Sequence, residues 1–400
     1  MDVKEHKESF EAIYRNCPLN ASHLTFPLAE IDKFEWTRGP WGNEYFSYYY
    51  RRFTYHILNR LDVKDGHRIL VVGCGAGLEE KNIDTLYPNV ELWSIDISQE
   101  MIKKAIANQS PSHFVVSLAE ALPFRDNNFD RVVSREVIEH VMVPQKMMSE
   151  ISRVLKPKGI AVITTENGGS FSPTNFYVIH ISSRLAKLLR CPVSTPEYKD
   201  EAPKLSEMKN YLRNASLELV EYFWDGALYK SLIHLRKFVR FKVSAWAHWF
   251  SCLENNRTMA YRFCDQAKFI LRKPEAPEAT ASNGAEISYS CIRCNGALRR
   301  LADDGCACEN CGRRYSIIDG IPNMVPCDDR QYENHIREIP SGRCLRRMAF
   351  RVIDYVLIRA YFVVYFLSAF LCTLFVKKNN KRYSHLLAAD DALLQHQIKR

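Results

Sequence analysis

The chain has 400 residues, a length that predicts two to three domains. Hydrophobic residues make up 46% and charged residues 25%, values that exclude wholesale disorder and fibrous repeats. The net charge of +9 is unevenly spread, because residues 331–400 hold 12 Lys and Arg but only 5 Asp and Glu. A basic tail beside a nearly neutral body indicates a local electrostatic role for the tail, and not a chain that is basic throughout to bind nucleic acid.

The first residues decide how the 13 cysteines are interpreted. MDVKEHKESF is polar and charged, and it lacks the apolar stretch of a signal peptide. We therefore expect the body of the protein in the cytoplasm, where clustered cysteines serve as metal ligands and disulfides are rare.

The expected elements follow one another in a regular order after an aromatic-rich N-terminal region. Residues 1–66 are predicted to form a helical or lid region. Between 67 and 273, apolar strands alternate with helix-like stretches, and the expected strands are RILVVG, VELWSID, HFVVSL, FDRVVS, GIAVITT, LELVEYFWD and residues 265–271. This alternation predicts an α/β fold in which helices cover both faces of a parallel sheet. Residues 167–210 and 227–262 break the rhythm and are predicted to be insertions.

A glycine-rich segment ends the first expected strand. ILVVGCGAG, residues 69–77, runs from apolar residues into Gly73-x-Gly75-x-Gly77 and then into a helix-compatible stretch. Glycines let a nucleotide or an amino acid lie against the backbone, and the following helix N-terminus offers N–H donors. The second expected strand ends in Asp96, whose carboxylate can accept both hydroxyls of a ribose. Nicotinamide cofactors and S-adenosylmethionine both fit this pattern.

The motifs that follow favour S-adenosylmethionine. The loop is G-x-G-x-G and not G-x-G-x-x-G, and AEALPFRDNNFDRVVSREVIEHV is followed by EISRVLKPKGIAVITT. This stretch resembles class I S-adenosylmethionine-dependent methyltransferases, in particular the small-molecule branch that includes the ubiquinone/menaquinone C-methyltransferases. The resemblance covers roughly residues 40–170 by motif and 210–273 by layout. It implies a seven-stranded Rossmann-like sheet with helices on both faces, and a cofactor at the carboxyl ends of the first strands.

The resemblance also implies which residues hold the cofactor. The glycine loop would hold its methionine part, Asp96 its ribose, and the residues after the second and third strands its adenine. The full implied set is Gly73, Cys74, Gly75, Gly77, Asp96, Ile97, Ala119 and Glu120. Two positions depart from the family pattern, because Val71 and Leu118 stand where relatives carry acidic residues. Each departure removes one polar contact to the cofactor.

Methyl transfer from a sulfonium is an in-line displacement, so the enzyme must align the acceptor and remove its proton where the acceptor carries one. Three residues just past the fourth expected strand are candidates for the general base: Glu136, Glu139 and His140. Glu139-His140 matches a pair common in the small-molecule branch, and a histidine can accept a phenolic proton. The alternative is that Glu139 and His140 hold the loop and the helix together by hydrogen bonds.

Two CxxC pairs lie beyond a linker of small and polar residues, 274–286. Cys291, Cys294, Cys308 and Cys311 have the spacing of a tetrahedral four-thiolate zinc site, which has no open coordination position and is therefore structural. Cys306 is a spare that competes with Cys308. Residues 289–326 resemble the zinc-ribbon family of the small activator subunit of tRNA and protein methyltransferases. We expect a zinc ribbon over 287–327 that packs on the catalytic domain or recruits a protein partner.

The end of the chain combines basic and apolar residues. Residues 360–376 carry no charge, and basic residues flank them on both sides. We expect residues 343–400 to form a membrane-associating tail with a C-terminal hydrophobic helix, and contact with the membrane through 343–382. Seventeen residues is the short limit for a bilayer span, so a spanning helix and an in-plane helix both remain open.

Three functions follow from these features. The first is an S-adenosylmethionine-dependent methyltransferase at the cytoplasmic face of a membrane, acting on an oxygen or carbon of a lipophilic or lipid-linked small molecule. The second is an RNA or protein methyltransferase whose zinc ribbon recruits the target. A nucleic-acid acceptor is disfavoured, because residues 134–137 lack the Asn/Asp-Pro-Pro-aromatic signature in which amine-methylating enzymes resemble one another. The third is an inactive cofactor-binding scaffold on a membrane.

Overall fold

The computed structural model of the chain describes residues 54, 56–171, 202–227, 257–275, 289–301, 305–325 and 363–374, with a few single positions between them. Most of the expected N-terminal region 1–66, most of both insertions, most of the expected linker 274–286 and the basic parts of the tail lie outside the described residues.

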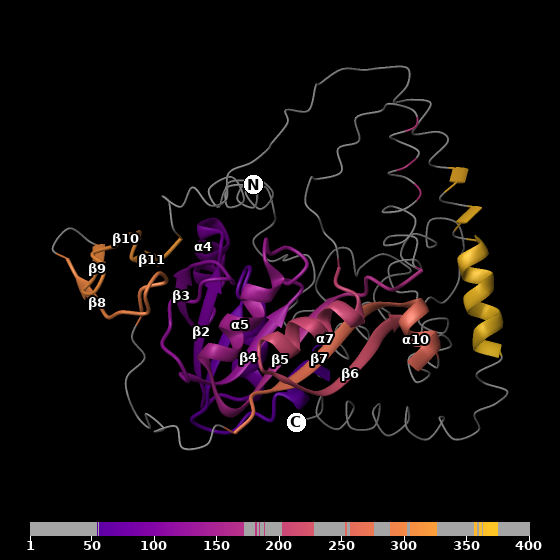
Figure 1. Ribbon diagram of the computed structural model, residues 1–400, viewed down its shortest axis with the longest axis horizontal. Coiled ribbons are helices and arrows are strands. Elements are labelled where there is room, and N and C mark those ends of the chain that lie inside the picture. The colour runs from indigo at the N-terminus through magenta and orange to yellow at the C-terminus, as the bar shows by residue number, and fades with distance from the viewer. Residues whose placement is uncertain are drawn as a thin grey trace.

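The described strands form one sheet of 11 strands in the order β6-β7-β5-β4-β1-β2-β3-β11-β10-β9-β8 (Figure 1). Seven come from the first part of the chain: β1 (Arg68–Val72), β2 (Glu91–Asp96), β3 (His113–Val116), β4 (Phe129–Arg135), β5 (Leu155–Glu166), β6 (Glu218–Ala227) and β7 (Cys264–Arg272). The cysteine-rich module supplies β8 (Leu298–Arg300), β9 (Gly305–Cys308), β10 (Arg314–Ile318) and β11 (Ile321–Asn323). The described sheet therefore has more strands than the seven that were expected.

The sheet is mixed, which corrects the expectation of a parallel sheet. β1 to β5 pair in parallel, but β7 runs antiparallel to both of its neighbours, β5 and β6. β7 lies directly beside β6, the strand that precedes it in the chain, and runs back along it. A parallel pairing of these two neighbours would instead need a crossover connection. This arrangement brings the start of β7 to the sheet edge at which β4 and β5 end.

Within the described part of the chain, five helices pack on the sheet: α3 (Leu78–Leu86), α4 (Gln99–Ala107), α5 (Pro144–Val154), α7 (Leu205–Asn214) and α10 (Arg257–Phe263). α5 and α7 lie side by side across the front of the sheet in Figure 1, where the Gln145 side-chain amide donates to the Tyr211 carbonyl oxygen at 3.2 Å.

Side chains four residues apart on a strand share a face. On one face of β4, Arg131 bonds the Leu61 carbonyl and Arg135 pairs with Glu79 of α3.

The cysteine-rich module extends the sheet beyond β3. β11 pairs in parallel with β3 through Asn323 and Val116, and the Met324 amide donates to the Val116 carbonyl oxygen at 2.8 Å. Tyr289 lies against two aromatic rings of the first domain, Trp93 at 5.7 Å and Phe124 at 6.0 Å between ring centroids. The module thus packs on the catalytic part of its own chain, as one of the two expected roles requires.

Residues 363–374 form a helix, here called the tail helix, which lies beside α10 at the end of the molecule away from the cysteine-rich module (Figure 1). The Tyr365 hydroxyl donates to the Phe263 carbonyl oxygen at 3.1 Å, and the Tyr361 hydroxyl, one turn before, donates to the Phe171 carbonyl oxygen at 2.9 Å. Among the described residues, no helix has both the length and the apolar composition that a membrane crossing requires.

Candidate active site

The glycine loop makes a tight turn between β1 and α3. Gly73, Gly75 and Gly77 all have positive φ angles, of 77°, 53° and 75°. The amides of Gly73 and Cys74 both donate to the Ile95 carbonyl oxygen at 2.9 Å, which ties the loop to the end of β2. Because L side chains rarely adopt these angles, glycine at the three positions is a requirement of the backbone.

Gly73 is also confined by a neighbour. A Cβ atom added to it would lie 2.3 Å from Cγ2 of Val137, which follows β4. The first glycine therefore lets the loop approach the segment that carries the candidate bases. Sequence reasoning assigned it to cofactor contact alone, since the approach joins residues 64 positions apart in the chain.

Asp96 lies at the carboxyl end of β2, beside the loop. Its side chain is only 9% exposed, and its two oxygens accept from the backbone amides of Gly75 and Ser98, each at 2.9 Å. These bonds hold the carboxylate at the edge of the sheet next to the glycine turn. An acidic side chain fixed beside a loop of this kind fits a ligand that has ribose hydroxyls.

The other expected cofactor residues lie at the same edge of the sheet. Ile97 follows Asp96 and packs on the core, and Ala119 and Glu120 follow β3. Glu120 accepts from the Met142 amide at 2.8 Å and the Val143 amide at 3.3 Å. Burial raises the pKa of Glu120, while these amide bonds act in the opposite direction. Glu120 thus joins the turn after β3 to the start of α5.

Cys74 is buried within the loop and lies near two acidic groups. Its side chain is 6% exposed, and burial raises its pKa well above the usual value, with Glu80 and Asp96 adding to the shift. The neutral thiol is therefore a packing group and not a nucleophile.

The three candidate bases follow β4, but their surroundings differ. The Thr165 hydroxyl donates to Oε2 of Glu139 at 2.9 Å, and the Thr164 hydroxyl donates to Oε1 of Glu136 at 3.0 Å. Glu136 has a φ of 53°, and its amide donates to the Thr164 carbonyl oxygen. Both glutamates thus tie the segment after β4 to the end of β5. His140 is half-buried at the end of this segment, and its amide donates to the Val137 carbonyl oxygen at 2.9 Å.

Two ion pairs at this edge were not expected from the sequence. Arg135 contacts Glu79 at 2.7 Å, and Lys268 pairs with Asp225 across β6 and β7; all four side chains are buried. His56 lies 3.9 Å from the Asp225 carboxylate. The members of each pair are more than 40 positions apart in the chain, so no local pattern could have indicated them.

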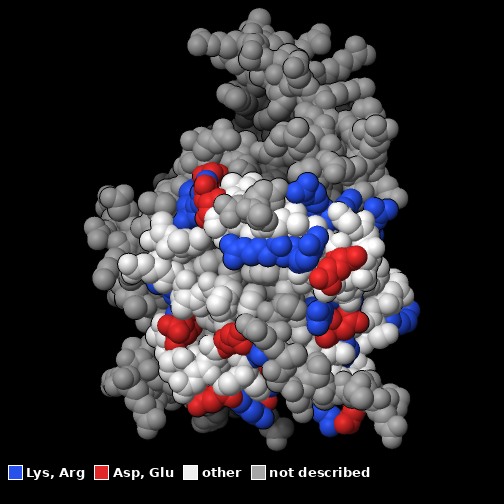
Figure 2. Space-filling model, turned by 90° about the vertical axis from the view of Figure 1, so that its left-hand side faces the viewer, with Lys and Arg blue, Asp and Glu red and all other residues white. Residues whose placement is uncertain are grey.

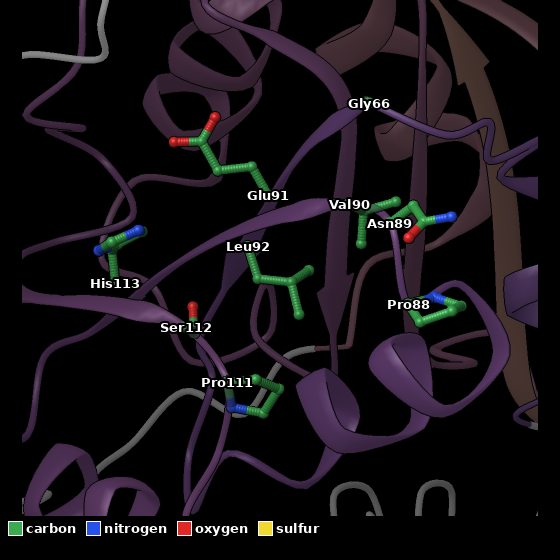
Figure 3. A pocket seen from close by; sticks show the side chains of 9 residues that line it. All are labelled: Gly66, Pro88, Asn89, Val90, Glu91, Leu92, Pro111, Ser112 and His113. Atoms are coloured by element: carbon green, nitrogen blue, oxygen red, sulfur yellow. The ribbon is translucent and has the colours of Figure 1, made fainter.

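A cavity of about 570 Å³ lies at the opposite edge of the sheet, lined by Gly66, Pro88, Asn89, Val90, Glu91, Leu92, Pro111, Ser112 and His113 (Figure 3). These residues precede or begin β1, β2 and β3, whereas the glycine loop and Asp96 lie where the strands end. The Glu91 carboxylate is engaged by Arg68 and Trp93, each at 2.9 Å. The cavity is therefore separate from the candidate active site.

The four expected metal ligands come together in the cysteine-rich module. The sulfur atoms of Cys291, Cys294, Cys308 and Cys311 all lie within 4.8 Å of one another, with pairs at 3.4 and 3.6 Å. Four thiolates about 2.3 Å from one tetrahedral ion would be about 3.8 Å apart, so the donor set fits such an ion. Cys306 lies outside the cluster, so Cys308 and not Cys306 belongs to the set of four candidate ligands. The Cys311 amide donates to the Cys308 sulfur at 3.5 Å and orients the second pair.

Comparison with known proteins places this geometry in a family. Residues 70–163 match the sequence model of the family described as "Methyltransferase domain". A ubiquinone biosynthesis O-methyltransferase of Xanthomonas oryzae pv. oryzae (strain PXO99A) is 32% identical over 181 residues, which cover 44% of this chain and 71% of the relative. The chain is a class I S-adenosylmethionine-dependent methyltransferase. The matched region runs from the glycine loop through Asp96 and the candidate bases to β5.

A second relative and one solved structure were also compared with the chain. The methyltransferase is 31% identical over 171 residues to the ubiquinone biosynthesis O-methyltransferase of Xanthomonas axonopodis pv. citri (strain 306), covering 41% of this chain and 67% of that one. Among solved structures, phosphoethanolamine N-methyltransferase 2 of Haemonchus contortus in complex with S-adenosyl-L-methionine has a TM-score of 0.44 and 19% identity. That alignment covers 66% of this chain and 60% of the other.

Proposed function

We propose that this methyltransferase transfers a methyl group from S-adenosylmethionine to an oxygen or carbon of a lipophilic or lipid-linked small molecule. The observation that carries the proposal is the shared sheet edge, where the glycine loop, Asp96 and the candidate bases meet. The relatives that are 31% and 32% identical are named for O-methylation in ubiquinone biosynthesis, which favours a phenolic oxygen on a ring with an apolar side chain.

Among the three candidate bases, His140 is the one we assign to proton removal. The carboxylates of Glu136 and Glu139 already accept from threonine hydroxyls of β5, an arrangement that suits groups holding the segment in place. When bound, S-adenosylmethionine supplies an electrophilic methyl group on a sulfonium. His140 would then accept the phenolic proton, while the loop and Asp96 hold the cofactor.

A membrane location follows from the lipophilic acceptor and from the tail. We place the enzyme at the cytoplasmic face of a membrane, with residues 343–382 as its contact. The tail helix is attached to Phe171, in the segment that follows β5, and to Phe263, just before β7. An acceptor confined to the membrane would therefore meet the enzyme beside the edge at which the cofactor is held.

Zinc is the ion we propose for the four-cysteine cluster, in a structural role. Two buried and two exposed thiols with this spacing provide a closed tetrahedral set with no position for a substrate. The site would hold β8 to β11 in the shape that pairs with β3.

The proposal is tested by calorimetric titration of S-adenosylmethionine into the full chain. We expect micromolar binding that Asp96→Ala weakens by at least about tenfold, because a carboxylate that binds two hydroxyls contributes more than about 1.4 kcal/mol. Asp84→Ala, an exposed change on α3, is the matched control and should bind as the parent does. Binding would justify a search of lipid extracts for the radiolabelled methyl acceptor. Absence of binding by folded protein would contradict the proposal.

One feature favours recruitment of RNA as a second candidate. Arg293, Arg299, Arg300 and Arg314 are exposed on the module. However, Figure 2 shows basic and acidic side chains interspersed among the described residues on the side of the molecule where the module lies, without one dominant sign. RNA affinity that falls steeply with salt, and less steeply when these arginines are changed to glutamine, would support this candidate.

A further inference from the structure

The tail helix has two faces of opposite character. One face is turned to the protein: Tyr365 is 4% exposed, and Ala369 and Thr373 are fully buried. These residues are spaced by four, as one side of a helix requires. The other face carries aliphatic side chains that are 42% to 64% exposed, at Val363, Val364, Leu367, Leu371 and Leu374.

This exposed apolar surface is concentrated at one place. The described residues contain 12 exposed large hydrophobic side chains, and seven of them lie between Val356 and Leu374. Single exposed apolar residues are ordinary on a protein surface, but a contiguous group marks an interaction site.

The way the helix is held determines how it can meet a partner. The hydroxyl of Tyr365 in the helix bonds the end of α10 at Phe263, and the hydroxyl of Tyr361, one turn before the helix, bonds Phe171 in the segment after β5. A helix that crosses a bilayer would have lipid or other membrane helices around it, whereas one face of this helix is buried and bonded to the end of α10. With only the outer side free, the helix can enter a membrane surface sideways and to a shallow depth.

Charge indicates what covers the outer face. Nine Lys and Arg residues but only one acidic residue, Asp354, lie between Arg343 and Arg382. Anionic lipid headgroups attract such a segment, each basic residue near the surface adding about 1 kcal/mol. A second copy of this chain is the less suitable occupant, because a two-fold contact would place these basic segments next to each other.

We propose that the tail helix lies in the plane of an anionic membrane, with Val363, Val364, Leu367, Leu371 and Leu374 among the acyl chains, and does not span the bilayer. The inference deepens the membrane part of the proposed function. It makes the membrane surface a neighbour of the sheet edge at which β5 ends and β7 begins, where Thr165 pairs with Ala267.

Vesicle flotation of the full-length protein tests the proposal. We expect stronger binding to phosphatidylcholine vesicles that contain phosphatidylglycerol than to phosphatidylcholine alone. Changing Val364, Leu367 and Leu371 to Gln should weaken this binding by at least about tenfold, because three buried apolar side chains are lost. The matched control changes Ile106, Val220 and Ile318 to Gln, side chains 39% to 48% exposed on other elements, and should bind as the parent does.

Three results with the purified protein would overturn the proposal, and a fourth comes from cell membranes. They are equal binding to both kinds of vesicle, undiminished binding by the tail variant, and a concentration-dependent dimer that the tail variant abolishes. Alkaline carbonate extraction of membranes from expressing cells should release an in-plane helix, so retention would indicate a span. S-adenosylmethionine titration of the parent protein separates the two proposals: normal cofactor binding by a parent that does not bind vesicles sinks only this inference.

Discussion

Two neighbouring glutamates in the first turn of α3 have different partners. Glu79 pairs with Arg135, while Glu80 accepts a hydrogen bond from the Ser94 hydroxyl at 2.6 Å and is fully buried. Burial raises the pKa of Glu80 to about 8, against an ordinary value of 4.5. The Glu80 side chain is therefore neutral in the folded protein at neutral pH, although an unfolded chain would ionise it.

This difference predicts a pH-dependent stability. Between the unfolded and folded pKa values the folded state holds one more proton, so the free energy of unfolding should fall by roughly 1.4 kcal/mol per pH unit as pH rises toward about 8. Glu80→Gln removes this slope, so its stability relative to the parent should increase with pH. Urea unfolding at several pH values measures the effect. Asp84→Asn, exposed on the same helix, should keep the parent's slope, and a Glu80→Gln curve parallel to that of the parent would contradict the prediction.

The candidate base and its neighbour should respond differently to the same change to glutamine. We expect His140→Gln to lower kcat by about 10²-fold or more with an acceptor that carries a phenolic proton, and to leave S-adenosylmethionine affinity unchanged. Glu139→Gln weakens the bond from the Thr165 hydroxyl at a buried site, so its main effect should be a lower free energy of unfolding, by about 1–2 kcal/mol. Steady-state kinetics and urea unfolding on both variants separate the roles. The assignment fails if His140→Gln retains full kcat.

At the scale of elements, the loop between β1 and α3 depends on contact with the segment after β4. Gly73 and Gly66 share a φ of +77°, but only Gly73 has an atom in the way of a Cβ. Alanine substitutions at the two positions therefore distinguish the energetic cost of backbone strain from the cost of steric overlap.

We expect Gly66→Ala to cost about 1–2 kcal/mol through strain alone. Gly73→Ala should cost at least about 2 kcal/mol more, because its Cβ would overlap Val137. Adding Val137→Ala to Gly73→Ala should recover part of the steric cost. Urea unfolding of the four variants, including Val137→Ala alone, gives the coupling free energy between positions 73 and 137. Strictly additive effects on the free energy of unfolding would show that the overlap is relieved elsewhere.

At the scale of the whole molecule, the cysteine-rich module closes an edge of the catalytic sheet. Without β11, the outer side of β3 would present unpaired backbone groups, and Trp93 and Phe124 would lose the Tyr289 ring. The stability of the methyltransferase should therefore depend on the proposed zinc ion, although the four cysteines lie outside the candidate active site.

Cys308→Ser and Cys306→Ser test this dependence as a matched pair. We expect Cys308→Ser to lose bound zinc and lower the temperature of unfolding, because it removes a ligand of the four-cysteine cluster. Cys306→Ser should keep both, since Cys306 lies outside the cluster although it is buried. Metal analysis and thermal unfolding provide the measurements. Equal zinc contents in the two variants would refute the ligand assignment.

Local patterns in the sequence were sufficient for several of these features. The strand that ends at Val72, the glycine turn after it, Asp96 at the end of β2 and the spacing of Cys291, Cys294, Cys308 and Cys311 each follow from preferences that act over a few residues. The positive φ angles at the three glycines and the clustering of the four sulfurs agree with those expectations.

Other features required the folded chain, because they join residues that are far apart in sequence. Nothing near Lys268 indicates Asp225, nothing near Asn323 indicates Val116, and nothing near Tyr365 indicates Phe263. The antiparallel β7, the module on the β3 edge and the attachment of the tail helix are all of this kind. Backbone and side-chain preferences act over a few residues. Burial and hydrogen bonding, in contrast, select partners that are distant in sequence, and these partners meet only in the folded sheet.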